Sequence, residues 1–197
     1  VLSGLNNLGA VLRDAGDLER AEPVLREALA LRRKALGNQH PEVAQSHNNL
    51  GEALAKKGAY AEAEASFRTA LDGWRTALGP DHPTVAFALL GLGWMMHTQG
   101  RCREAEPLLR EGLGIRLAKL DQGSVQVATA RQALGSCLVA LRRFGEAETI
   151  LLASYAVLRK ERGEDYEFTR RSRSALAQLY RVSGRPEQAL VYTQQGE

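Results

Sequence analysis

A strict 42-residue period runs through the sequence and dominates what the chain can fold into. One leucine, which we expect to face the core, marks each unit without an insertion: Leu8, Leu50, Leu92, Leu134 and Leu176. An alanine follows thirteen residues after each leucine: Ala21, Ala63, Ala105, Ala147 and Ala189. A third series, at Gly16, Gly58, Gly100 and Gly184, is interrupted only at Arg142. Because self-similarity at such a period is the signature of repeat architectures, we expect one small motif repeated along the chain.

Each unit is predicted to be a pair of helices. In the second repeat, Pro41 suits a first helical position, where its missing N–H is not needed. Gly58 is expected to end that helix with a positive φ. The next helix begins at Tyr60, and its apolar residues recur at spacings of three, four and seven. β-branched residues are sparse and no alternating run appears, so strands are not expected.

Small residues recur where the two helices of a pair are expected to meet. Glycine follows the first four marker leucines, as in Gly9 and Gly51, and the alanine series lies early in each second helix. Small side chains at both places allow the helices to approach closely. One pair cannot bury its apolar stripe alone, so neighbouring pairs are expected to stack into a continuous core.

The repeat unit resembles a known family. The run Leu5-Asn6-Asn7-Leu8-Gly9, then Ala21-Glu22-Pro23, then Gly37-Asn38-Gln39-His40-Pro41 is similar to a tetratricopeptide repeat (TPR), in the 42-residue form of kinesin light chains and many bacterial proteins. The resemblance implies an all-α fold, a right-handed superhelical solenoid of about five TPR helix-turn-helix repeats. Its first helices would line a concave groove that holds peptides or partner proteins.

The predicted boundaries follow the period. We expect a single TPR array over residues 1–197, with repeats at approximately 1–40, 41–82, 83–124, 125–166 and 167–197. The array is expected to be a fragment of a longer chain, since no polar capping helix is evident at its end. Arginine outnumbers lysine, 21 to five, which favours a bacterial source.

Composition excludes several classes of protein. The 26 basic and 23 acidic residues are interspersed and give a net charge of only +3, so a nucleic-acid partner is not expected. No apolar run approaches the roughly 20 residues that cross a bilayer, so no membrane association is expected. Two unpaired cysteines fit a reducing compartment, and we predict a cytoplasmic location.

No catalytic or metal-binding motif stands out. The sequence lacks a zinc-protease helix, a nucleophile elbow and a phosphate loop, so we predict no enzyme activity and no cofactor. Cys102 and Cys137 are 35 residues apart, and His97 stands alone near a helix end, so a zinc site is not expected. His40 and His82 precede proline in matching turns, where we expect them to be cap or turn residues.

The first helices carry the candidate binding residues. Asn7 and Asn49 match the asparagine that TPR proteins aim at a peptide backbone, and one amide can satisfy both an N–H and a C=O. The alternative is that these amides bond a neighbouring repeat. Phe87, Leu90 and Trp94 have helical spacing and form either an aromatic wall in the groove or ordinary core between repeats.

The predicted function is a protein–protein interaction scaffold that binds a peptide segment or partner protein in the concave groove. The groove lacks the Lys and Arg with which chaperone-binding relatives clamp a carboxylate. The alternatives are a regulatory or targeting region of a larger enzyme or signalling protein, such as a bacterial kinase or nucleotide-binding protein, and self-association through the end repeats. The predicted partner-binding residues are Asn6, Asn7, Asn48, Asn49, Glu52, Phe87, Leu90, Trp94, Gln132 and Ser136.

Overall fold

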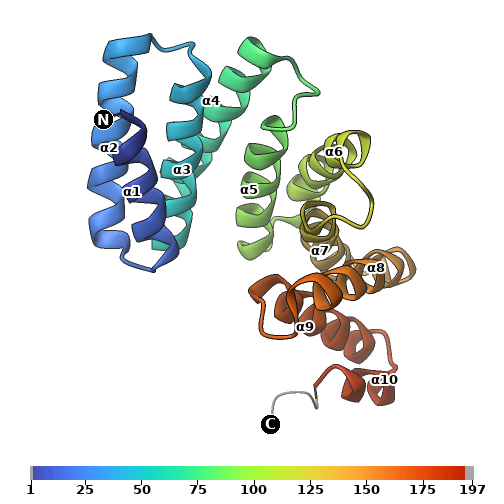
Figure 1. Cartoon of the computed structure of the whole chain (residues 1–197). Coiled ribbons are helices and arrows are strands. Elements are labelled where there is room, and N and C mark those ends of the chain that lie inside the picture. Colours follow the sequence, from blue (N-terminus) through green and yellow to red (C-terminus); the bar gives the residue numbers. More distant parts are fainter. Residues whose placement is uncertain (1, 194–197) are drawn as a thin grey trace. The chain divides into compact units, whose positions relative to one another are not determined.

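The computed structural model describes residues 2–193, and this part of the chain is helical without a strand (Figure 1). Short turns join the helices into successive pairs, as the period predicts. The ten described helices are α1 (Leu2–Asp14), α2 (Leu18–Leu36), α3 (Pro41–Lys57), α4 (Tyr60–Leu78), α5 (Val85–Thr98), α6 (Cys102–Lys119), α7 (Val125–Ala140), α8 (Phe144–Arg162), α9 (Glu167–Val182) and α10 (Pro186–Val191).

The chain forms two compact units, one up to Met95 and the other from Met96 onward. In the first unit α1 packs against α2, and α3 packs against α4. The contact between α2 and α3 connects these two pairs. In the second unit α7 packs against α8, and α9 packs against α10. In addition α6 contacts α7, and α8 contacts α9. The helix pairs and their order of packing are those expected of a stacked repeat.

Local signals in the sequence explain where the helices begin and end. The His40 side chain caps α3 by accepting the backbone N–H of Glu42 at 3.2 Å, and His82 accepts that of Thr84 at 3.3 Å. Gly58 ends α3 in the left-handed conformation, with φ of 86°. His40 is therefore confirmed as a cap residue and His82 as a turn residue just before α5, and the predicted helix end at Gly58 is confirmed as well.

The one break in the glycine series marks a strained residue. Arg142 takes the place of Gly16 and Gly58, and it too has a positive φ, of 61°. Left-handed backbone costs a residue with a Cβ about 1–2 kcal/mol. The turn between paired helices therefore imposes this conformation whether or not a glycine is present.

The small residues permit the close approach of paired helices. A Cβ on Gly9 would lie 2.6 Å from the Leu25 side chain, and one on Gly51 would lie 3.1 Å from Phe67. The equivalent repeat position in the second compact unit is Gly135, where a Cβ would lie 2.6 Å from the Leu151 side chain. These distances are shorter than ordinary van der Waals contact, so the predicted role of the glycines is confirmed.

The marker leucines are buried with one exception. Leu50, Leu92, Leu134 and Leu176 are at most 3% exposed, whereas Leu8 is 47% exposed. The expectation that Leu8 faces the core was wrong. Leu50 lies on α3, which packs against both α2 and α4, whereas among the described helices α1 packs mainly against α2.

Alanine at Gly135 is expected to destabilise the second unit by about 1–3 kcal/mol, because Leu151 is fully buried and has no room to withdraw. Gly114→Ala on α6 is the matched control, since nothing lies within 4 Å of the added Cβ. That change is expected to stabilise the chain by up to about 1 kcal/mol through helix propensity. Urea unfolding of both variants measures the difference, and shifts of the same sign would contradict the close approach.

Candidate functional site

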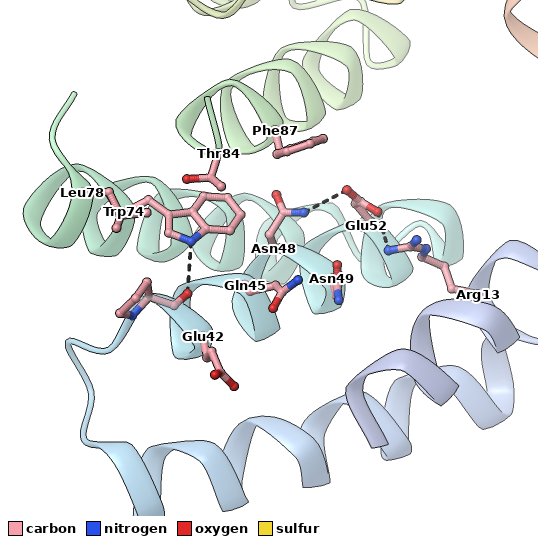
Figure 2. Close-up of a pocket in the computed structure, with 11 residues that line it drawn as sticks. Arg13, Glu42, Gln45, Asn48, Asn49, Glu52, Trp74, Leu78, Thr84 and Phe87 are labelled. Atoms are coloured by element: carbon pink, nitrogen blue, oxygen red, sulfur yellow. Dashed lines mark hydrogen bonds and ion pairs between the residues drawn. The ribbon is translucent and has the colours of Figure 1, made fainter. Parts of the chain in front are cut away.

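An open pocket of about 430 Å³ lies in the first unit, between α3 and the residues where α4 ends and α5 begins (Figure 2). One wall is polar and comes from α3, and the other is largely apolar and comes from α4 and α5. The lining residues are Arg13, Pro41, Glu42, Gln45, Asn48, Asn49, Glu52, Trp74, Leu78, Thr84 and Phe87.

The polar wall is one face of α3. Gln45, Asn48, Asn49 and Glu52 are spaced three, four and seven apart, which places them on the same side of a helix. The Asn48 Nδ2 group donates to Glu52 Oε1 at 2.9 Å, while the buried Asn48 Oδ1 has no partner among the described residues. No hydrogen bond of the described chain engages the side-chain amide of Gln45 or Asn49, so this wall offers both donors and acceptors.

The apolar wall is built around two aromatic rings. Trp74 on α4 is 4% exposed, and its indole N–H donates to the Pro41 carbonyl at 3.1 Å, which fixes the plane of the ring. Phe87, on the first turn of α5, is 50% exposed, and Leu78 at the end of α4 is 37% exposed. The pocket therefore presents apolar surface that the chain itself leaves uncovered.

An ion pair closes one end of the pocket. Arg13 from α1 pairs with Glu52, and their side chains are 10% and 33% exposed. Desolvation in the pocket raises the pKa of Glu52, against the opposing effect of the Arg13 charge. At the other end, Glu42 pairs with Arg32 at 3.2 Å. Both carboxylates of the pocket thus have a cationic partner.

The structure brings four of the predicted binding residues into this pocket: Asn48, Asn49, Glu52 and Phe87. Asn7 lies exposed on α1, outside the pocket. Leu90 is only 8% exposed and Trp94 is half-buried, and neither lines the pocket. Of the proposed aromatic wall, Phe87 alone opens into it.

The remaining predicted residues are buried. Asn6 is 1% exposed, and its Oδ1 accepts the Ser46 hydroxyl at 3.2 Å. Gln132 is 1% exposed and donates to Ser136 at 2.9 Å. The Asn6 bond joins α1 to α3, whereas the Gln132 bond lies within α7, and none of these residues lines the open pocket.

The sequence analysis did not single out Trp74 and Leu78, because it considered first helices only. A signal was present: stepping by 42 residues places Trp74 in the seat of Arg32 and Arg116. Those arginines donate to carbonyls at the start of a first helix, Arg32 to Glu42 and Arg116 to Gln126. At the equivalent position Trp74 places a flat aromatic ring in the pocket wall instead of a guanidinium group.

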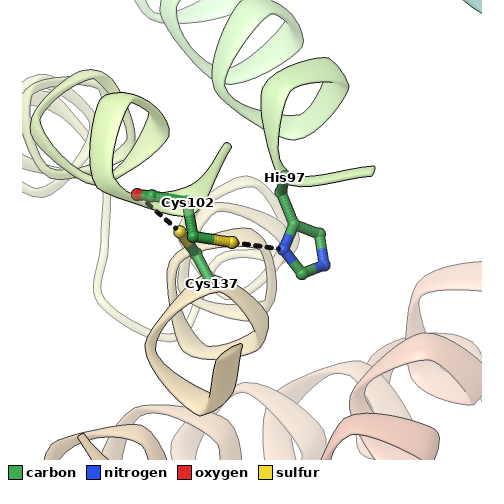
Figure 3. A group of neighbouring side chains, drawn as sticks. All are labelled: His97, Cys102 and Cys137. Atoms are coloured by element: carbon green, nitrogen blue, oxygen red, sulfur yellow. Dashed lines mark hydrogen bonds between the residues drawn. The ribbon is translucent and has the colours of Figure 1, made fainter. Parts of the chain in front are cut away.

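The second unit contains a cluster that the sequence analysis did not expect. His97, Cys102 and Cys137 place one nitrogen and two sulfur atoms within 4.8 Å of one another (Figure 3). The interpretation that His97 stands alone near a helix end was therefore wrong. The linear spacing of 35 residues conceals the contact, because Cys102 begins α6 and Cys137 lies on α7, which packs against it.

Paired helices, recurring caps and an open pocket on a first helix define a helix-pair repeat scaffold. The chain belongs to the tetratricopeptide repeat family, whose model matches residues 1–72, 44–118 and 126–196. None of the curated proteins compared with the chain matches it significantly.

Solved structures share the fold. A putative kinesin light chain of Podosopora anserina with nearly identical TPR-like repeats is 21% identical, with a TM-score of 0.78 over 98% of this chain and 92% of that one. BtubC (BKLC) from P. vanneervenii is 20% identical, with a TM-score of 0.79 over 97% of this chain and 76% of that one. YrrB, described as a TPR protein with an unusual peptide-binding site, is 21% identical, with a TM-score of 0.56 over 95% of this chain and 80% of that one.

The helices of residues 2–193 also bear on membrane insertion. None of them combines the length and the apolar character that crossing a lipid bilayer demands.

A double-mutant cycle on Arg13 and Glu52 is expected to give a coupling free energy of about 1–2 kcal/mol, because removing either partner leaves the other poorly solvated. The exposed pair Arg26–Glu62, with side chains 46% and 63% exposed, is the control. Solvent screening should limit its coupling to less than about 1 kcal/mol. Equal couplings, measured by urea unfolding, would show that the pocket does not desolvate its ion pair.

Proposed function

We propose that the chain is a protein–protein interaction scaffold whose first unit holds an extended peptide segment with an apolar or aromatic anchor. The observation that carries the proposal is that one pocket holds two amides, Gln45 and Asn49, which make no side-chain hydrogen bond within residues 2–193, opposite the half-exposed ring of Phe87.

The amides suit a peptide backbone. Gln45 and Asn49 lie one helical turn apart on α3 and line the same wall. Each carries both donors and an acceptor, so together they can satisfy main-chain N–H and C=O groups of a segment lying along the helix. Side-chain amides recognise the backbone irrespective of sequence, and the anchor then supplies the selectivity.

The apolar wall suits an anchor side chain. Trp74 is held in place by its bond to Pro41, while Phe87 and Leu78 keep a large fraction of their surface exposed. An aromatic or branched side chain seated among them would remove this surface from water. Aromatic anchors in such pockets carry a large share of binding energy.

The charges favour an internal segment of the partner over a chain terminus. Arg13, which lines the pocket, is already paired with Glu52, and the buried Arg32 is paired with Glu42 of the lining. A terminal carboxylate would have to compete with these pairs. YrrB, a TPR protein with an unusual peptide-binding site, is a precedent in the same fold for recognition of this class of ligand.

The test is selection of peptides from a displayed random library, followed by titration of the selected peptides on purified variants. Asn49→Ala is expected to weaken binding by about five- to twentyfold, the effect of losing one or two hydrogen bonds. Phe87→Ala is expected to weaken it by about tenfold or more, since it removes the anchor's partner.

The control is Asp72→Ala, an exposed position on α4 outside the pocket, which should leave affinity unchanged. Selected peptides should share an apolar or aromatic residue. If peptides bind both pocket variants as tightly as they bind the unaltered chain, the pocket is not the peptide site.

Self-association is a second proposal, supported by the exposure of Leu8 and Val11 on α1, at 47% and 65%. Sedimentation of the chain at several concentrations tests it, and a concentration-independent monomer excludes it.

A cytoplasmic location, and a role as the regulatory region of a larger enzyme or signalling protein, also remain proposals. The coding sequence on either side of the array decides the latter.

A further inference from the structure

The cluster of His97, Cys102 and Cys137 has the composition of a metal site. It combines one imidazole and two thiols, donors that soft and borderline divalent ions prefer. Both cysteines are free thiols and almost fully buried, at 3% and 0% exposure, while the histidine is half-buried. The sulfur atoms are thus shielded from bulk water, and the histidine lies at the accessible side.

The distances suit a tetrahedral ion. His97 Nδ1 lies 3.1 Å from Cys102 Sγ, and all three donor atoms lie within 4.8 Å of one another. Zinc bonds of about 2.3 Å to sulfur and about 2.0 Å to nitrogen would separate two sulfurs by about 3.8 Å and a sulfur and nitrogen by about 3.6 Å. Each pair therefore needs to move by about 1 Å or less.

The surrounding elements hold the three donors from three directions. His97 is on the last turn of α5, Cys102 is the first residue of α6, and Cys137 is on α7 (Figure 3). The Cys137 thiol donates to the Cys102 carbonyl at 3.2 Å, which aims it into the cluster.

The repeat provides an internal comparison. One period earlier, the seats of His97, Cys102 and Cys137 are held by Ala55, Tyr60 and Met95, and one period later by Val139, Phe144 and Leu179. Neither set contains an imidazole or a thiol. The helix pairs therefore pack without ligating residues in these seats, and all three donor residues coincide at a single place in the array.

We propose that His97, Cys102 and Cys137 form a zinc-binding site that ties α5, α6 and α7 together, with a fourth position open to water or an external ligand. Two thiolates and a neutral imidazole carry two negative charges, which Zn²⁺ neutralises. A singly charged ion would leave a net charge in a buried place, at an energetic cost.

Binding requires the loss of two thiol protons. Burial raises the pKa of the Cys137 thiol in the metal-free protein, and the neighbouring Cys102 raises it further. A coordinated Zn²⁺ deprotonates a thiol outright, so the ion supplies the driving force. The hydrogen bond between His97 and Cys102 is then replaced by bonds from each residue to the metal.

The test uses the reduced, metal-stripped chain and titrates it with Co²⁺, a spectroscopic substitute for Zn²⁺, and then with Zn²⁺. We expect one Co²⁺ per chain with thiolate charge-transfer absorption, displacement of Co²⁺ by Zn²⁺, and a rise in Tm on adding Zn²⁺. His97→Ala is expected to weaken Zn²⁺ binding by about tenfold or more. His47→Ala, a histidine outside the cluster, should leave it unchanged.

The decisive variant copies the seats one period later: His97→Val, Cys102→Phe and Cys137→Leu together. It preserves an apolar contact that the array already uses, so circular dichroism should remain helical while the thiolate absorption and the Tm shift disappear. The proposal is overturned if this variant binds Zn²⁺ as tightly as the unaltered chain, or if Co²⁺ binds without thiolate absorption. Binding of Cu⁺ but not of Zn²⁺ would overturn the assignment to zinc.

Discussion

The structure depends on the contact between a helix backbone that lacks a Cβ and a large apolar side chain of its partner helix. Gly9 against Leu25 and Gly135 against Leu151 are the same contact in different repeats. Because this contact fixes how far apart the paired helices lie, it also fixes which residues of successive pairs can touch. The contacts that recur between successive pairs, ion pairs included, depend on this spacing.

The features that the sequence predicted are local or periodic. Helix ends at His40 and Gly58 depend on residues within one turn, and the small residues recur at a fixed period. Both features can therefore be predicted from the sequence alone. Leu8 was misjudged because burial depends on a neighbouring helix that a pattern does not supply. Trp74 was missed because only first helices were searched for binding residues, although the period places it at the position equivalent to Arg32 and Arg116.

The thiol cluster was missed for a different reason. Metal motifs are sought at short linear spacings, whereas stacked repeats bring together residues separated by slightly less than one period. Lys57 pairs with Glu22 at an offset of 35 residues, and Arg110 pairs with Glu146 at an offset of 36. Cys102 and Cys137 stand at the first of these offsets. Applied to the sequence, this rule would have paired the two cysteines.

The near-period offset has an evolutionary consequence. In a chain assembled by duplication, any seat exists in several copies, and the sister copies preserve the framework while one of them diverges. His97, Cys102 and Cys137 give one place in the array a chemistry of its own, while the equivalent positions one period to either side carry no imidazole or thiol. A solenoid can in this way acquire a new property in a single module, without redesigning the rest of the molecule.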